Sequence, residues 1–375
     1  MFRIFYAEKD ATLYESVPTQ NTGLDEILEI GKRLGTDGST LLKSRSLVKF
    51  DMAEISASLS IYSKTVNDCK FVLQLYTSHA KNLPAEYTVS AKLAAESWTN
   101  GTGYLASVVT DGVTWSDPDL GNTVNTWISS SQNIQISTST LYVSGSGAGG
   151  SWMYQSASLG STAGLITSES FSYRPSDVNM DVTNAVKIWT SGSGGVTIPN
   201  YGFLIQFSDA DELNDIVKGY VRFFSRETQT IYVPRLTMYW DNSTFTTGSL
   251  TSANLESYVV YTNIKPTYKD TEIAKIRIYT RDKYPQKSPT NLFPEQTVKF
   301  LPATTSYAVF DAATDEAIIP FDDIYNKVSC DTTSNFIYLD LNGFMPERYY
   351  RLEFKIKDGF TTQYVDDQIY FKVIR

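Results

Sequence analysis

Residues 223–240 read FFSRETQTIYVPRLTMYW and place a serine, an arginine and a carboxylate in a row before an alternating strand pattern. Residues two apart on a strand share a face, so Ser225 and Glu227 follow Phe223 towards the core while Arg226 points away. Neighbours on one strand do not converge as a catalytic cluster, and no His or Lys stands beside Ser225 to activate it. We therefore expect no catalytic residue here and a structural role for the stretch.

A carboxylate near a core face needs a partner, because an unpaired buried charge is costly. Arg45, in the early strand pattern KSRSLVKFD, is the predicted partner of Glu227. In the strand that closes the stretch, Leu236, Met238 and Trp240 alternate on the predicted inward face. The stretch thus predicts a sheet protein whose polar residues stabilise the fold.

Short runs of alternating apolar residues recur along the chain, separated by Gly, Pro, Asn and Asp. Many short strands with turn signals between them are typical of an antiparallel sandwich or jelly roll, so we predict an all-β protein. In the first two thirds of the chain, strands are predicted at residues 3–7, 11–15, 26–32, 45–52, 70–77, 87–94, 201–208 and 219–225.

One helical pattern is present, in NMDVTNAVKIWTSG. Asp181 can cap a short helix, after which Val182, Ala185, Val186 and Trp189 share one face at i, i+3, i+4 and i+7 spacing. We expect this helix to cover one end of the sandwich.

The chain of 375 residues is long enough for two domains. The strand pattern pauses at residues 244–256, which predicts a jelly-roll β-sandwich over residues 1–245 and a smaller, Ig-like β-sandwich over residues 255–375. A Ser/Gly-rich insertion interrupts the first domain at about residues 129–170. Within it, Trp152, Met153 and Tyr154 either fold back on their own sandwich or anchor a contact with a neighbour.

Composition and charge exclude several classes of function. A formal net charge of −9 opposes binding to a nucleic-acid backbone. The single histidine, His79, excludes a zinc site with two His ligands, and we interpret it as a surface residue where a strand gives way to a loop. Cys69 and Cys330 are far apart and form no CxxC pair, so we expect two reduced, buried or half-buried thiols.

The segment WSDPDLGN places Asp117 and Asp119 near Asn122, and their oxygens suit Ca²⁺. The spacing lacks the twelve-residue pattern of an EF-hand, and an Asx-Pro turn explains the segment more simply. We therefore predict no required metal and no cofactor. No apolar run is long enough for a membrane helix and the N-terminus has no secretion signal, so we expect synthesis in the cytoplasm.

The order of several segments resembles the DNRLRE-type β-sandwich, a jelly-roll relative of carbohydrate-binding modules. The segments that carry the resemblance are DATLYE (10–15), NTGLDEILEIGK (21–32), SRSLVKFD (44–51), ESWTNGTG (96–103), GVTW (112–115), MDVTNAVKIW (180–189), NYGFLIQF (200–207) and the stretch at 223–240. They span about residues 2–240. The Ser/Gly-rich stretch departs from the family pattern, and the C-terminal sandwich lies outside the resemblance.

The same pattern at the very N-terminus, without a secretion signal, is similar to virion structural proteins of contractile-tailed, especially marine, bacteriophages. The resemblance implies a non-enzymatic structural or adaptor protein, made in the host cytoplasm and located in the virion in multiple copies. Tandem sandwiches suit a bridging role in the tail, baseplate or neck. The expected partners are other virion structural proteins, with no nucleic acid and no membrane insertion.

Two further hypotheses stay open at this stage. The first is a carbohydrate- or receptor-binding module on the virion surface, or a capsid decoration protein, in which Trp98, Tyr104 and Trp115 stack on sugar rings; alternatively the tryptophans pack in the core. The second is a glycoside hydrolase, which needs two convergent carboxylates beside an aromatic cleft, and no stretch combines them.

A basic stripe follows one face of the predicted strand at residues 273–281, where Lys275, Arg277 and Arg281 alternate with apolar residues, and Lys283 extends it. The stripe either docks an acidic partner or forms a solvated strand that resists aggregation.

Overall fold

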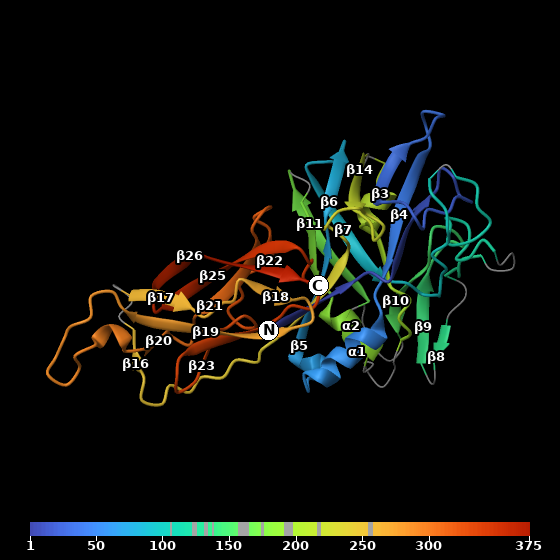
Figure 1. The fold of residues 1–375 in the computed structure, drawn as a ribbon. Helices are drawn as coiled ribbons and strands as arrows, with labels where there is room; N and C mark the ends of the chain where they lie inside the picture. The colour runs from blue at the N-terminus through green and yellow to red at the C-terminus, as the bar shows by residue number, and fades with distance from the viewer. Residues whose placement is uncertain are drawn as a thin grey trace. The chain divides into compact units, whose positions relative to one another are not determined.

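The protein is almost entirely β in the computed structural model (Figure 1), which confirms the predicted all-β class. The structure describes residues 1–105, 107–121, 126–130, 134–136, 139–156, 165–173, 176–190, 198–215, 219–253 and 258–375. The chain forms two compact units. The N-terminal unit is Phe5–Met238, and the C-terminal unit is Met1–Ile4 together with Tyr239–Arg375.

The unit boundary differs from the pause in the strand pattern, because the first four residues belong to the C-terminal unit. The amino group of Met1 donates to the carbonyl of Trp240 at 2.8 Å and to that of Tyr325 at 2.5 Å. These bonds join chain positions more than 200 residues apart, and a local sequence pattern carries no signal of such pairings.

The N-terminal unit is a jelly-roll-like β-sandwich. Its strands are β1 (Phe2–Tyr6), β2 (Lys9–Tyr14), β3 (Ile27–Leu34), β4 (Leu41–Lys49), β5 (Cys69–Leu75), β6 (Thr77–Lys81), β7 (Glu86–Leu93), β8 (Ile134–Ile136), β9 (Ser139–Ser144), β10 (Trp152–Ser156), β11 (Ile166–Ser172), β12 (Val178–Asp181), β13 (Phe203–Phe207), β14 (Gly219–Phe224) and β15 (Arg235–Trp240); β1 and β15 each also contribute residues to the C-terminal unit. One sheet has the order β1-β15-β5-β12 and the other the order β11-β7-β13-β4-β3-β14-β6, with β2 paired to β4. A small sheet β10-β9-β8 lies in the Ser/Gly-rich insertion.

Burial along the strands follows the apolar pattern of the sequence. In β14, Gly219, Val221 and Phe223 are buried and alternate with half-buried residues, as predicted. Strand β15 is buried at every position, so Leu236 and its neighbours on both faces are covered. A strand that is buried on both faces lies in the interior of a fold, and its alternation marks no solvent side.

Three short α-helices lie among the described residues of the N-terminal unit. The predicted helix is confirmed as α2 (Thr183–Thr190), where a carboxylate oxygen of Asp181 accepts from the backbone N–H of Thr183 at 3.0 Å. Its residues Ala185, Val186 and Trp189 are buried. Sequence analysis gave no sign of α1 (Met52–Ile61) and α3 (Asp209–Leu213), which begin after the capping residues Asp51 and Ser208.

The C-terminal unit is a second β-sandwich. Its strands are β16 (Thr251–Ser252), β17 (Tyr258–Thr262), β18 (Thr267–Lys269), β19 (Ile273–Asp282), β20 (Lys299–Phe300), β21 (Ser306–Asp311), β22 (Ala317–Ile319), β23 (Ser329–Cys330), β24 (Asn335–Asp340), β25 (Arg348–Asp358) and β26 (Thr361–Ile374). One sheet has the order β16-β20-β19-β24-β23, with β17 on β19, and the other β18-β26-β25-β21-β22.

The core of the C-terminal unit comes from alternate residues of its long strands. Ala274, Ile276 and Ile278 of β19 are buried, as the alternation predicts. On β25 the buried set is Tyr350, Leu352, Phe354 and Ile356, again the set that the sequence predicts. Each strand therefore turns one face to the core and the other to solvent.

Candidate functional site

Ser225 and its neighbours stabilise a turn and form no reactive group. The Ser225 hydroxyl is buried, donates to the carbonyl of Asp25 at 2.5 Å, and accepts from the backbone N–H of Glu227 at 3.1 Å. The backbone N–H of Arg226 donates to the buried carboxylate of Asp10 at 2.6 Å. Burial raises the pKa of Asp10 to about 7, and this hydrogen bond opposes the shift. These hydrogen bonds hold the turn that follows β14 against residues 10 and 25.

The predicted ion pair between Arg45 and Glu227 is wrong, because Arg45 pairs with Glu212 of α3. The Arg45 Nε and Nη2 atoms donate to the two oxygens of Glu212 at 3.1 and 2.6 Å, and both side chains are buried. Glu227 is 35% exposed, and its ion-pair contact is with Arg226 at 3.8 Å. Strand β14 ends at Phe224, so the alternation that directed Glu227 to the core stops before it.

The buried pair holds the Ser/Gly-rich insertion on the sandwich. Arg45 Nη1 donates to the carbonyl of Gly149 at 2.6 Å, and its guanidinium lies 5.3 Å from the ring centres of both Trp115 and Trp152. The ammonium of Lys92 lies 3.9 Å from the Trp152 ring centre. These cation–π contacts and hydrogen bonds fasten the segment around β10 to the larger sheet.

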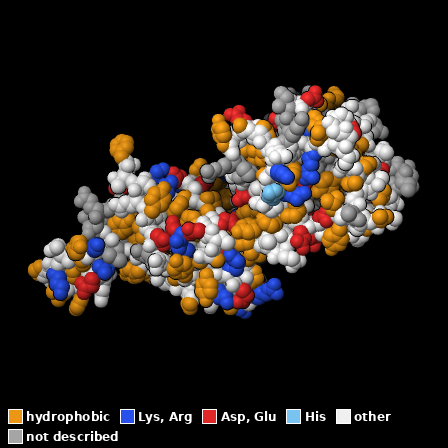
Figure 2. Space-filling model, turned by 90° about the horizontal axis from the view of Figure 1, so that it is seen from above, with side chains coloured by type: hydrophobic (Ala, Val, Ile, Leu, Met, Phe, Trp, Pro, Cys, Tyr) orange, Lys and Arg blue, Asp and Glu red, His pale blue; other side chains and the backbone are white. Residues whose placement is uncertain are grey.

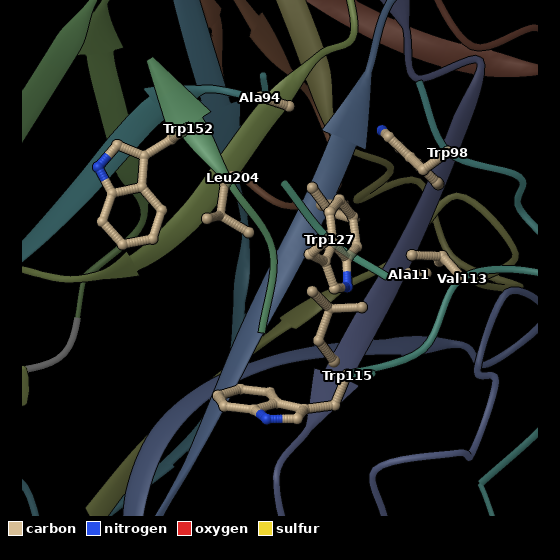
Figure 3. Close-up of a cluster of buried hydrophobic side chains, with 10 residues drawn as sticks. Ala11, Ala94, Trp98, Val113, Trp115, Trp127, Trp152 and Leu204 are labelled. Carbon is tan, nitrogen blue, oxygen red and sulfur yellow. The ribbon is translucent and has the colours of Figure 1, made fainter. Parts of the chain in front are cut away.

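Tryptophans from separate segments form a buried cluster (Figure 3). Its members are Ala11, Leu13, Leu47, Ala94, Trp98, Val113, Trp115, Trp127, Trp152 and Leu204. Trp98 and Trp115 are buried, so the structure favours the core alternative for both and removes them as platforms for sugar rings. Of the three predicted glycan contacts, Tyr104 alone is exposed, at 52%.

The predicted anchor segment at the end of the insertion also packs inward. Trp152 and Met153 are buried, which makes them core residues and contradicts their role as contacts for a neighbour. Tyr154 is 37% exposed and lies against Tyr142 with ring centres 6.3 Å apart. The segment therefore folds back on its own sandwich, which is one of the two predicted alternatives.

The described residues of the loops at 15–26 and 99–121 form one hydrogen-bonded surface, and we call these two loops the acidic loop cluster. At its base, Asn21 is buried and its side-chain amide donates to the carbonyls of Asn100 and Val113, both at 2.8 Å. The Asn21 side-chain oxygen accepts from the backbone N–H groups of Gly23 at 3.1 Å and Gly103 at 2.8 Å. One side chain thus fixes both loops.

A glycine keeps the two loops in close contact. Gly112 has φ +82, and a Cβ atom there would lie 2.3 Å from the Cα of Gly101. A residue larger than glycine is therefore excluded at position 112. The close contact of the two loops there gives a rigid support for their exposed side chains.

The exposed face of the acidic loop cluster combines apolar side chains with carboxylates. Val108 is 98% exposed, and Val17, Tyr104 and Leu105 are exposed beside it in the same two loops. The cluster contains no Lys or Arg, and its carboxylates are Glu15, Asp25, Glu26, Asp111, Asp117 and Asp119. Its charge is therefore uniformly negative.

The residues considered for metal or thiol chemistry have other roles. The Asp119 carboxylate accepts from Thr99 Oγ1 at 3.0 Å and from Gly121 N–H at 3.2 Å, and Asn122 lies outside the described residues. Within the described ranges, no three His, Cys, Asp or Glu residues gather in a metal-binding geometry. Cys69 and Cys330 are free and buried, and burial raises the pKa of each thiol to about 11.

His79 is exposed, as predicted, but it lies within β6 rather than in a loop. Its ring centre is 5.8 Å from that of Tyr220 on the neighbouring strand.

The basic stripe on β19 is largely neutralised within its own sheet. Arg277 donates to both oxygens of Asp331 at 2.9 and 3.0 Å, and Lys275 lies 3.4 Å from the same carboxylate. The guanidinium holds the pKa of Asp331 below its usual range. Arg281 donates to the carbonyl of Asp282 at 3.1 Å, which leaves its charge without a carboxylate in the described part of the chain.

Residues 281–299, which join β19 to β20 and which we call the basic loop, form a second exposed apolar surface. Tyr284, Leu292 and Phe293 are exposed at 71%, 63% and 62%. The loop encloses an open hollow of about 490 Å³, lined by Asp282, Tyr284, Pro285, Gln286, Asn291, Pro294, Thr297 and Lys299. The sequence predicts Arg281 and Lys283 of this surface as part of the basic stripe. It gives no prediction for the apolar Leu-Phe pair, which lies among three prolines and outside any strand pattern.

Comparison with known proteins assigns no family. No protein-family model matches the chain, and no curated protein matches it. Among solved structures, the β-glucuronidase of Parabacteroides merdae, with glycerol in its active site, matches at 9% identity and a TM-score of 0.17. The match covers 81% of this chain and 28% of the enzyme. A similarity this low carries no argument about function.

Ser225, Arg45 and Glu212 thus form internal bonds, and large apolar side chains are exposed on loops of both units. No helix in the described ranges has the length and apolar character of a membrane span. The two exposed loop surfaces are the candidate functional sites.

Proposed function

We propose that this chain is a non-enzymatic structural or adaptor protein of a bacteriophage particle, acting through contacts with other virion proteins. The observation that supports it most is the exposure of large apolar side chains on loops of both units, including Val108 and Phe293. Exposed apolar clusters rimmed by charge are typical of protein–protein interaction sites.

The internal bonding of the reactive side chains favours a role without catalysis. Ser225 has no base beside it, and Arg45 and Glu212 satisfy one another inside the sandwich. A hydrolase would need a pair of carboxylates facing a cleft. Asp10 has the raised pKa of a general acid, but it is buried beneath the turn that contains Arg226.

The order of segments that resembles the phage DNRLRE-type sandwich supports a place in the particle. Two sandwiches joined in one chain suit a bridging adaptor of the tail, baseplate or neck. A glycan-binding role has less support, because Trp98 and Trp115 belong to the buried cluster.

The experiment is to band particles from a lysate that contains this chain, wash them in high salt, and quantify the chain by mass spectrometry against a known virion protein. The proposal expects the chain to be retained at a fixed ratio in every preparation. Loss of the chain from banded particles, or turnover of a polysaccharide by the purified protein, would show that the proposal is wrong.

A further inference from the structure

The basic loop carries positive charge that is not neutralised within the chain. Residues 281–299 contain four cations and two carboxylates in a chain whose formal net charge is −9. Lys299 pairs with Asp282 at 2.6 Å, whereas the exposed Lys283 and Lys287 have no ion pair among the described residues. Figure 2 shows basic side chains beside apolar ones on this loop, at the left of the view.

The acidic loop cluster offers the opposite charge in the same setting. Glu26 is exposed and Asp117 is half-buried, and neither pairs with a Lys or Arg in the described part of the chain. The carboxylates of Asp25 and Asp111 accept from N–H and O–H groups of their own loops, which do not cancel their charge. Val108 is almost fully exposed in the same loops.

We propose that the basic loop of one copy binds the acidic loop cluster of a second copy of this chain. Each surface joins exposed apolar side chains to charges that are not paired within the chain. These charges are predominantly positive on the basic loop, which also exposes Glu295, and negative on the acidic loop cluster. The hollow of about 490 Å³ in the basic loop gives a concave partner for the projecting side chains around Val108. Charge complementarity selects the partner, and the apolar contacts stabilise the pair.

The contact joins two different surfaces, which determines what it builds. A heterologous contact repeats from copy to copy and produces a ring or a filament, whereas an isologous contact stops at a dimer. An interface limited to two loops lies below roughly 1,000 Å² and is weak for a single pair. Repetition of the contact within a particle would strengthen the binding. The inference rests on the proposed function for this repetition, whereas two copies of the purified chain are enough to form the contact itself.

The experiment is sedimentation velocity of the purified full-length chain over a range of concentrations at low and high salt. We expect association that grows with concentration and weakens by about tenfold or more in high salt, because exposed charges are screened there. Two charge-reversal variants follow: Lys283→Glu with Lys287→Glu on the basic loop, and Glu26→Lys with Asp117→Lys on the acidic loop cluster. Each variant alone should associate more weakly than the wild type. The first changes the net charge of the basic loop from +2 to −2, so that it repels the acidic loop cluster, and the second lowers the net charge of the cluster from −6 to −2.

The decisive sample is an equimolar mixture of the two variants. Each chain retains one native surface, so the mixture restores one native contact and should associate more strongly than either variant alone. The matched control for the basic-loop variant, Lys81→Glu with Lys269→Glu, makes the same change in net charge at exposed positions outside both surfaces and should associate as the wild type does. If a reversal variant misfolds, the pair Leu292→Ser with Phe293→Ser, alongside Val108→Ser, tests the same contact without charge changes.

A wild-type chain that stays monomeric at low salt, a mixture that stays monomeric, or a control that dissociates would each overturn the inference. These outcomes are separate from the particle experiment. If the chain is retained in particles but does not self-associate, the contact is rejected and the proposed function stands. If the chain self-associates but is not retained in particles, the contact stands and the proposed function is rejected.

Discussion

Replacement of Glu212 by alanine is expected to destabilise the N-terminal unit strongly. Arg45 would keep its bond to Gly149 but lose two charge-assisted bonds of 3.1 and 2.6 Å while remaining buried. Breaking one side of a buried pair costs about 3–5 kcal/mol. Each kcal/mol lowers the melting temperature of a unit of this size by about 2–4 °C, so the expected fall is roughly 6–20 °C.

Denaturant unfolding followed by tryptophan fluorescence reports this unit selectively, because five of the six tryptophans lie in Phe5–Met238 and only Trp240 lies outside it. The matched control is Glu227→Ala, which removes a half-exposed carboxylate and should change the free energy of unfolding by less than about 1 kcal/mol. The double variant Arg45→Met with Glu212→Leu should recover most of the loss, because apolar residues often replace a buried pair without penalty. A small effect of Glu212→Ala, or an equal effect of Glu227→Ala, would refute the assignment of the pair.

Three further outcomes are expected. The native state holds the Asp10 proton more tightly than the unfolded chain does, so the free energy of unfolding should fall as pH rises from about 4 to 7. Urea unfolding at several pH values measures this fall, and Asp10→Asn should remove it. An unchanged pH profile in the variant would count against the raised pKa of Asp10. Asn21→Ala should lower the free energy of unfolding by about 3 kcal/mol or more, because it removes the partners of two buried N–H groups, of the buried carbonyl of Val113 and of the half-buried carbonyl of Asn100. Hydrogen exchange at Gly103 should become faster, and unchanged exchange would contradict the expectation. Trp98→Ala should lower the free energy of unfolding by about 3–5 kcal/mol, because it truncates a buried core residue. It should leave any glycan binding of the folded protein unchanged, and a selective loss of binding on a glycan array would restore the hypothesis that Trp98 stacks on a sugar ring.

Sequence periodicity predicts the elements that have one buried face. Strand β19 and helix α2 follow this rule, because the apolar residues recur at the spacing of a strand in β19 and of a helix in α2. Helix α1 escaped detection because it buries only Ile55, Ser58 and Leu59, which is too narrow a stripe to stand out. Elements whose apolar stripe is short are therefore the ones that a local pattern misses.

The partner of a buried charge is a long-range property. Alternation on β14 gives no account of Glu212, which approaches Arg45 from a five-residue helix 167 positions away in the chain. The burial of Trp98 and Trp115 likewise depends on how the insertion folds back, and composition alone leaves a tryptophan free to be core or surface. The apolar residues of the basic loop were not predicted for the opposite reason, because exposed loops carry no periodic signal.

Cryo-electron microscopy of intact particles tests most directly the central claim that this chain works through its outer surfaces. The account predicts density for two β-sandwiches per copy at symmetry-related positions, with the basic loop of one copy against residues 99–121 of the next. Particles whose density lacks these sandwiches, with the chain left free in the lysate, would contradict it.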